Sequence, residues 1–175
     1  LLGLGTVGER SKTGRNLLLY SLKGMGTNKN LESAVDKFPD DFGRRYSGAL
    51  SSQQAYGLVL TDVARNLPEL ATRIVTVSPD VASSTNLGGW INRVGVWGIH
   101  QEELMPEEEG VIRSLDWHES PDGQHIELGI SENNLFMMLG QLGLSKELCG
   151  ELLFPIGTLY DPFVKRGLDA FTYSV

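Results

Sequence analysis

The order of short apolar runs and amphipathic segments is the feature that most restricts how this chain can fold. Three runs have strand length and strand composition: "RIVTVS" at residues 73–78, "QHIELG" at 124–129 and "ELLFPIG" at 151–157. Segments with helical spacing precede the first run and follow the second and third. Strands that alternate with helices predict an α/β fold with a parallel sheet flanked by helices. In such sheets, ligands bind beyond the carboxyl ends of the strands.

Start signals locate two of the helices. "SSQQ" fits a capping box in which Ser51 is the cap and Gln54 reaches back to it, and apolar residues recur at helical spacing until Pro68. Ser131 is expected to cap a helix over residues 131–143. The apolar face of that helix comprises Leu135, Met138, Leu139 and Leu142. A final helix is expected to reach the chain end. Its shared face comprises Phe163, Gly167 and Phe171.

The remaining segments lack such signals. Residues 1–47 are interpreted as an irregular lead-in or linker, and "DVASSTNLGG" at 80–89 as a polar loop. Residues 98–123 are loop-like and contain an acidic cluster, "EELMPEEEG", which is best explained as a solvated surface. We therefore expect one domain, over residues 48–175.

Composition argues against several classes of protein. A net charge of −7 disfavours a nucleic-acid partner, since such domains carry a basic field for phosphates. No apolar run approaches the roughly 20 residues that a membrane-spanning helix needs. Cys149 is the one cysteine, so an internal disulfide is excluded and a reducing cytoplasm is indicated. We expect its thiol to be buried among apolar residues.

Three familiar kinds of site find little support. "GLGTVG" at residues 3–8 has the spacing of a dinucleotide-binding loop, but no strand precedes it and no helical stripe follows, so a flexible lead-in is favoured. His100, His118 and His125 have no partner at metal-ligand spacing, and we predict no metal ligands in this chain. No Gly-x-Ser-x-Gly motif is present to indicate a nucleophilic hydrolase.

Polar and aromatic residues follow each of the three predicted strands. Asp80 follows the first strand, Glu132 the second, and Tyr160 and Phe163 the third. A carboxylate in the first turn of a helix complements the helix dipole, which by itself is sufficient to explain Glu132. The position at the ligand-facing edge of the sheet favours a second interpretation. A carboxyl beside aromatic rings suits a flat heterocycle, which stacks on the rings and bonds to the carboxyl.

Three blocks of sequence resemble, in order, the pyrimidine-binding domain of transketolase-like, thiamine-diphosphate-dependent enzymes. The blocks are "SSQQAYGLVLTDVARNLPELATRIVTVSPDVAS", "DGQHIELGISENN" and "FPIGTLYDPFVKRGLDA". They are most similar to the homodimeric pyruvate dehydrogenase branch of the 2-oxo acid dehydrogenase family. The resemblance implies that residues 48–175 form a truncated, partial pyrimidine-binding domain of the thiamine-diphosphate-binding fold.

The same resemblance implies a role for each of the four residues. Glu132 would be the catalytic residue that hydrogen-bonds the aminopyrimidine ring of the cofactor and favours its imino tautomer. Tyr160 and Phe163 would be the cofactor-binding aromatic residues that pack on this ring, and which of the two stacks directly on it is left open. Asp80 would be a cofactor-binding residue in the loop on the same side.

Part of the family's site is expected outside this chain. The family holds thiamine diphosphate and Mg²⁺ through a Gly-Asp-Gly motif followed by an Asn, and the "PDGQ" of this chain is no such motif. We therefore expect a fragment of a larger cytoplasmic enzyme. Its pyrimidine half-site would face a diphosphate-binding domain or the second subunit of a homodimer, and the fragment alone would be inactive.

Three functions are consistent with the resemblance. The first is oxidative decarboxylation of pyruvate or a related 2-oxo acid, with acyl transfer to a lipoyl acyltransferase as partner. The second is ketol transfer between sugars, as in transketolase. The third is a non-catalytic domain that retains the fold.

Overall fold

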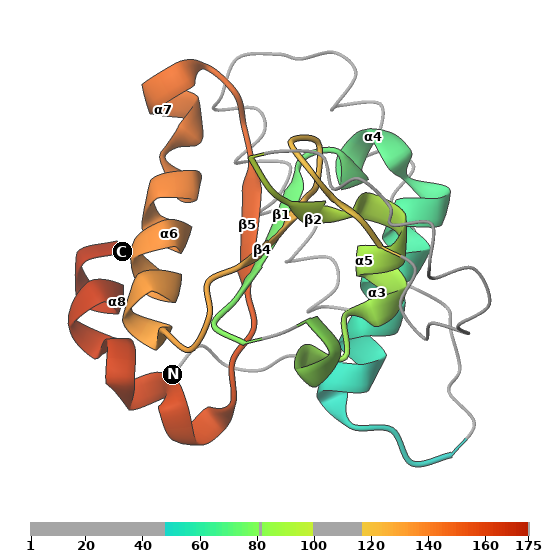
Figure 1. Ribbon diagram of the computed structural model, residues 1–175, viewed down its shortest axis with the longest axis horizontal. Helices are drawn as coiled ribbons and strands as arrows, with labels where there is room; N and C mark the ends of the chain where they lie inside the picture. The colour runs from blue at the N-terminus through green and yellow to red at the C-terminus, as the bar shows by residue number, and fades with distance from the viewer. Residues whose placement is uncertain (1–47, 81, 100–116, 175) are drawn as a thin grey trace, which may run out of the picture.

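A computed structural model describes residues 48–80, 82–99 and 117–174 (Figure 1). The predictions for residues 1–47 and for the acidic cluster lie outside these residues. Five parallel strands form one sheet in the order β3-β2-β4-β1-β5. They are β1 (Ile74–Ser78), β2 (Val96–Trp97), β3 (Glu119–Ser120), β4 (His125–Glu127) and β5 (Phe154–Gly157). The predicted α/β fold with a parallel sheet is confirmed, and its assignment to the thiamine-diphosphate-binding type stays a prediction.

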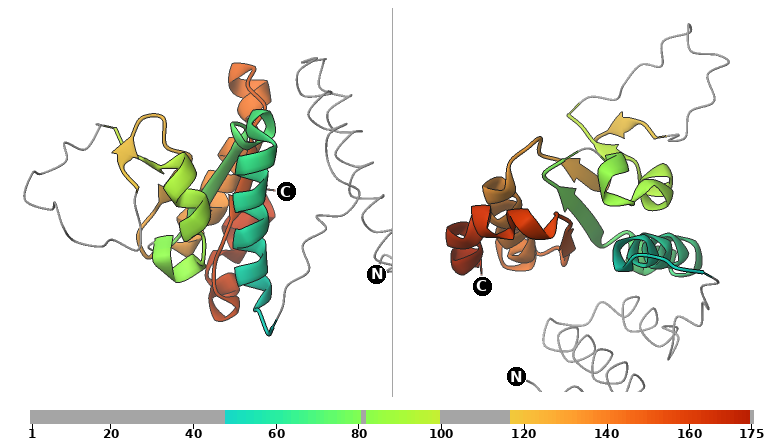
Figure 2. Two further views of the ribbon diagram at one scale, coloured as in Figure 1. Left: turned by 90° about the vertical axis from the view of Figure 1, so that its right-hand side faces the viewer. Right: turned by 90° about the horizontal axis from the view of Figure 1, so that it is seen from below.

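Helices cover both faces of the sheet and produce three layers (Figures 1 and 2). One side carries α3 (Ser52–Asn66), α4 (Pro68–Ala71) and α5 (Gly88–Val94). The other side carries α6 (Glu132–Gly143), α7 (Ser145–Cys149) and α8 (Leu168–Ser174). The described residues also include two 3-10 helices: η1 (Ala82–Thr85), after β1, and η3 (Asp161–Gly167), which runs into α8.

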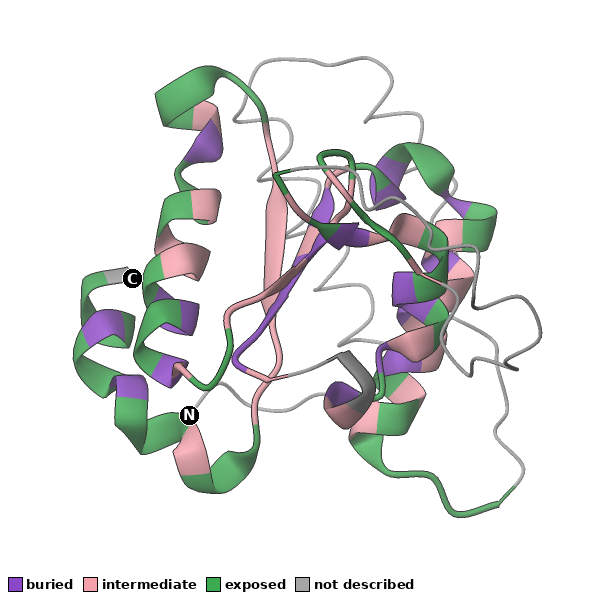
Figure 3. Cartoon of the chain, viewed as in Figure 1, coloured by how far each residue is buried: buried purple, intermediate pink, exposed green. Residues whose placement is uncertain are grey.

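The three longer strands lie within the predicted runs, whereas the two shortest were missed. β3 lies in the interval interpreted as loop-like, and β2 lies just before it. Each has two residues, so an alternation of period two cannot be seen in the sequence. β1 lies between β4 and β5 and is largely buried, whereas β5 is an edge strand of intermediate exposure (Figure 3).

The two predicted helix starts have different outcomes. Ser51 forms the predicted capping box: its Oγ accepts from the Gln54 amide at 3.1 Å, and Gln54 Oε1 accepts from the Ser51 amide at 3.0 Å. Ser131 occupies the predicted N-cap position of α6, but the predicted side-chain cap is wrong, because its hydroxyl makes no capping hydrogen bond. Only its backbone carbonyl joins the helix, accepting from the Leu135 amide at 3.2 Å.

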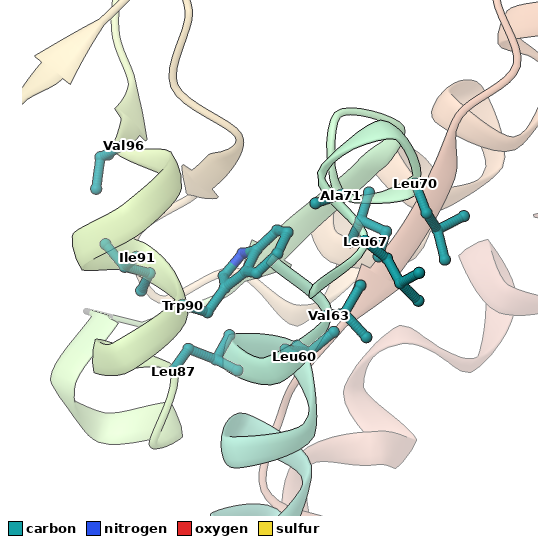
Figure 4. Close-up of a cluster of buried hydrophobic side chains, with 10 residues drawn as sticks. Leu60, Val63, Leu67, Leu70, Ala71, Leu87, Trp90, Ile91 and Val96 are labelled. Atoms are coloured by element: carbon teal, nitrogen blue, oxygen red, sulfur yellow. The ribbon is translucent and has the colours of Figure 1, made fainter. Parts of the chain in front are cut away.

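The expectation of a polar loop at residues 80–89 is wrong, because the end of this segment belongs to the hydrophobic core between α3, α5 and the sheet (Figure 4). That segment contains η1 and the start of α5, whose Trp90 and Ile91 are fully buried. The Gly88-Gly89 pair suggested a loop, but it permits a close helix contact. A Cβ on Gly89 would lie 2.8 Å from Thr61 Oγ1 of α3. The core cluster comprises Leu60, Val63, Leu67, Leu70, Ala71, Ile74, Leu87, Trp90, Ile91 and Val96.

Two further expectations about the C-terminal part are corrected. The expected final helix is present, but it consists of η3 followed by α8, and the three residues of its expected face have different neighbours. Gly167 and Phe171 contact Phe136 of α6, whereas Phe163 lies against the side chain of Arg166. Cys149, expected to be buried, is exposed at the end of α7, where its thiol donates to the Ser145 carbonyl at 2.9 Å. No helix in the described ranges is long and apolar enough to cross a membrane.

Candidate functional site

All four predicted site residues line one cavity of about 170 Å³ beyond the carboxyl ends of β1, β4 and β5. These strand ends point to the lower edge of the sheet in Figure 1. Asp80 comes from the loop after β1, Glu132 begins α6 after β4, and Tyr160 and Phe163 follow β5. Their proximity agrees with the sequence argument, and their functional roles stay predictions. The other lining residues are Pro79, Thr85, Ile130, Thr158, Leu159 and Arg166.

Glu132 places a buried carboxylate in this cavity. Its position at the N-terminus of α6 aims it at the edge of the sheet, and only 7% of the residue is exposed. The guanidinium of Arg166, from η3, donates from Nη1 to Glu132 Oε1 at 3.3 Å. A buried carboxylate requires such a partner, because removing an ionised group from water is costly. The cation is 34 residues away in sequence, and it was missed by sequence reasoning.

Arg166 also lies over an aromatic ring. Its guanidinium carbon is 4.1 Å from the centroid of the Phe163 ring, which is within the range of a cation–π interaction. The two residues are three apart in η3, and residues at that spacing lie one above the other in a 3-10 helix. That spacing is the sequence signal that could have identified Arg166.

A glycine allows η3 to approach the first turn of α6. A Cβ on Gly167 would lie 2.3 Å from a ring carbon of Phe136 and 2.9 Å from the carbonyl oxygen of Glu132. Because only hydrogen fits there, the backbone of η3 comes close enough for Arg166, the preceding residue, to reach the Glu132 carboxylate.

The two predicted aromatic residues differ in what they contact. Tyr160 is 41% exposed, and its hydroxyl donates to the Ser84 carbonyl of η1 at 2.6 Å, so it ties η1 to the start of η3. Phe163 is half-buried and meets Tyr160 edge to face, with centroids 6.4 Å apart and an interplanar angle of 85°. Of the two rings, Phe163 is the one whose face bears a flat cationic group.

A buried hydrogen-bond network supports the Asp80 side of the cavity. His125 of β4 is fully buried, with Thr76 Oγ1 2.8 Å from its Nδ1 and Ser78 Oγ 3.3 Å from its Nε2. Trp90 Nε1 donates to Thr76 Oγ1 at 2.9 Å, and the Ser78 hydroxyl donates to the Asp80 carbonyl. Because the Ser78 proton is used on Asp80, Ser78 accepts from Nε2–H, which makes Nδ1 the acceptor from Thr76.

The electrostatics of this network favour a neutral imidazole. Burial lowers the pKa of His125 from 6.5 to about 4. The His125 ring is therefore uncharged at neutral pH, and the network acts as a rigid support for the loop that follows β1. We assign it no chemistry.

One polar atom of the cavity wall lacks a hydrogen-bond partner among the described residues. It is Thr158 Oγ1, which is buried just beyond the end of β5. Such an atom is rare in a folded protein unless a ligand or water completes its bonding. No group of three or more His, Cys, Asp or Glu side chains within the described ranges could hold a metal ion.

Known proteins provide limited similarity. Over 94 residues, which is 54% of this chain, the sequence is 27% identical to the pyruvate dehydrogenase E1 component of Corynebacterium glutamicum. The match covers 10% of that protein, so the chain spans about a tenth of the length of this curated relative. No protein-family model and no solved structure matches the chain. The chain is thus partially similar to a pyruvate dehydrogenase component, and its parallel sheet is compatible with that relation.

Proposed function

We propose that this chain forms the pyrimidine half of the cofactor site in a thiamine-diphosphate-dependent enzyme that oxidatively decarboxylates pyruvate or a related 2-oxo acid. One observation carries the proposal. Residues from three separate segments, selected for a flat heterocycle, line one cavity with a buried carboxylate and an aromatic face. The partial similarity to a pyruvate dehydrogenase component supports the reaction class.

The residues present fit an aminopyrimidine ring. The guanidinium of Arg166 is flat and carries N–H donors, and it bonds to Glu132 while lying over Phe163. These are the two contacts that an aminopyrimidine would need, so the position of the guanidinium supports a site for a flat group with N–H donors. The hydroxyl oxygen of Thr158 would offer a further hydrogen bond. Asp80 would border the ring from the loop after β1.

The size of the cavity supports a half-site. Small-molecule sites usually have volumes of about 300–1,000 Å³. With Arg166 in place the cavity is about 170 Å³, so this space together with the room that the guanidinium now fills suits one ring of a cofactor rather than the whole. The diphosphate and Mg²⁺ would then be held by another domain or by the second subunit of a homodimer. A lipoyl acyltransferase would be the partner that receives the acyl group.

The residues of this chain would act on the ring by orientation and by proton control. Bound thiamine diphosphate supplies the carbanion chemistry of such enzymes. Glu132 Oε1 or Oε2 would hold the proton shared with a ring nitrogen, which fixes the tautomer of the ring. Phe163 would stack on the ring and exclude water from one face. Tyr160, tied to Ser84, would limit movement at the rim.

The test uses the full-length protein with thiamine diphosphate, Mg²⁺ and pyruvate, and with an artificial electron acceptor in place of lipoyl. We expect saturable cofactor binding by calorimetry and pyruvate-dependent reduction of the acceptor. Cofactor binding with ketol transfer between sugars, but without acceptor reduction, would assign the site to a transketolase-type enzyme. Absence of thiamine diphosphate binding would contradict the proposal.

A further inference from the structure

Arg166 makes the contacts that the proposed ligand would make. Its guanidinium bonds to the carboxylate of Glu132 at 3.3 Å and covers the ring of Phe163 at 4.1 Å. Only 8% of the Glu132 side chain is exposed, so little surface is left for a second partner while the arginine is in place. The face of Phe163 cannot hold the guanidinium and a heterocycle at the same position.

We propose that Arg166 is an internal occupant of the pyrimidine subsite, which holds Glu132 and Phe163 in place and moves out when the ligand ring enters. The inference rests on the proposed function and specifies how that site is kept before cofactor binding. Arg166 is a positioning residue in this account, because it acts through Glu132.

The side chain of Arg166 can leave the subsite directly into solvent. Its side chain is 55% exposed, so the guanidinium can move into water without crossing the core. The bond to Glu132 is also long: charge-assisted N–H···O bonds are usually about 2.7–2.9 Å, against the 3.3 Å found here. A long bond from a half-exposed cation is easily exchanged.

An occupant of this kind has a physical benefit and a cost. Without it, the buried carboxylate of Glu132 would have to remain unpaired until the ligand arrives, which destabilises the folded protein. With it, the ligand must compete against an intramolecular group, so the observed affinity is lower than that of the empty site.

The experiment compares Arg166→Gln with Lys165→Gln in the full-length protein, titrated calorimetrically with thiamine diphosphate and Mg²⁺. Both variants remove one cation from η3, but Lys165 is exposed and does not line the cavity. We expect Arg166→Gln to bind about three- to fivefold more tightly than the wild type, in keeping with the modest strength of a half-exposed ion pair. Lys165→Gln should bind within about twofold of the wild type.

Two additional readouts separate occupation from simple support. Thermal unfolding without ligand should show Arg166→Gln to be less stable than the wild type, and thiamine diphosphate should raise its Tm by more than it raises that of the wild type. Arg166→Lys keeps the charge without the planar fork, and its affinity should lie between the other two. This variant also provides the affinity comparison if Arg166→Gln does not fold.

The outcomes distinguish the inference from the proposed function. If the wild type binds thiamine diphosphate and loss of the guanidinium leaves affinity equal or weaker, Arg166 supports the site rather than occupies it, and the inference is overturned. If neither protein binds, the proposed function fails and the inference fails with it. Tighter binding by Arg166→Gln supports both.

Discussion

Two buried ionisable side chains, His125 and Glu132, are held in opposite ways. His125 has both ring nitrogens engaged by β1 side chains, and this network is further fixed by Trp90 of α5. Glu132, at the edge of the sheet, is paired with a half-exposed arginine. A closed network on rigid elements stabilises a single arrangement, whereas an ion pair at a cavity can exchange its partner. The difference distinguishes a polar group that is enclosed within the fold from one that lines a cavity beside a half-exposed partner.

The largest effect is expected from substitution of Glu132, measured as turnover. In the full-length protein, Glu132→Gln should lower the proposed pyruvate-dependent turnover by about 10²- to 10⁴-fold, because Gln retains the shape but cannot hold or transfer a proton. Steady-state kinetics with pyruvate and an artificial acceptor measure the loss. Glu147→Gln on the exposed surface of α7 is the control and should keep full activity. Near-normal turnover of Glu132→Gln would remove the basis for treating it as the catalytic residue.

The buried network around His125 should make the free energy of unfolding depend on pH. His125 binds a proton near pH 6.5 when unfolded but only near pH 4 when folded, so the unfolded state binds more protons between these values. The free energy of unfolding should therefore be greatest above pH 6.5 and decrease as the pH falls towards 4. The total loss from this residue is about 3 kcal/mol. Urea unfolding at a series of pH values measures it.

A matched variant isolates the contribution of the imidazole. His125→Asn should reduce stability at neutral pH, by about 1–3 kcal/mol for unsatisfied buried partners. It should also flatten the decrease between pH 6.5 and 4, since the titrating group is gone. A pH profile as steep as that of the wild type would show that other groups cause the decrease.

The next largest effect is expected on stability, where a substitution disturbs the close contact between η3 and α6. In Gly167→Ala, the added methyl would collide with the Phe136 ring and with the Glu132 carbonyl, which should cost about 1–3 kcal/mol of stability. Gly143→Ala, in α6, is the matched control, because a Cβ there has nothing within 4 Å. It should be neutral or stabilising. Chemical unfolding of both variants tests this, and equal stabilities would contradict the close contact.

The smallest effect compares two serines that precede helices. Ser51→Ala removes a capping box and should cost about 1 kcal/mol, whereas Ser131→Ala removes no capping bond and should cost little. Thermal unfolding can resolve the difference. A larger loss at Ser131 than at Ser51 would reverse the assignment.

The candidate site could be anticipated in part. Asp80, Glu132, Tyr160 and Phe163 were found because parallel strands end at one edge of a sheet, which makes distant residues neighbours. Arg166 could not be paired with Glu132 in this way, because the contact depends on how closely η3 approaches α6. That approach depends in turn on the absence of a side chain at Gly167.

Local signals in the sequence determined the start of α3 at Ser51, the strand at Ile74–Ser78 and the parallel arrangement of the sheet. These features depend on neighbouring residues and on chain order, both of which the sequence contains. Only the tertiary structure decided that α5 buries Trp90, that Cys149 is exposed and that Glu132 is paired with Arg166. Each of these results from packing between segments far apart in the chain, where a few tenths of an ångström decide which groups meet.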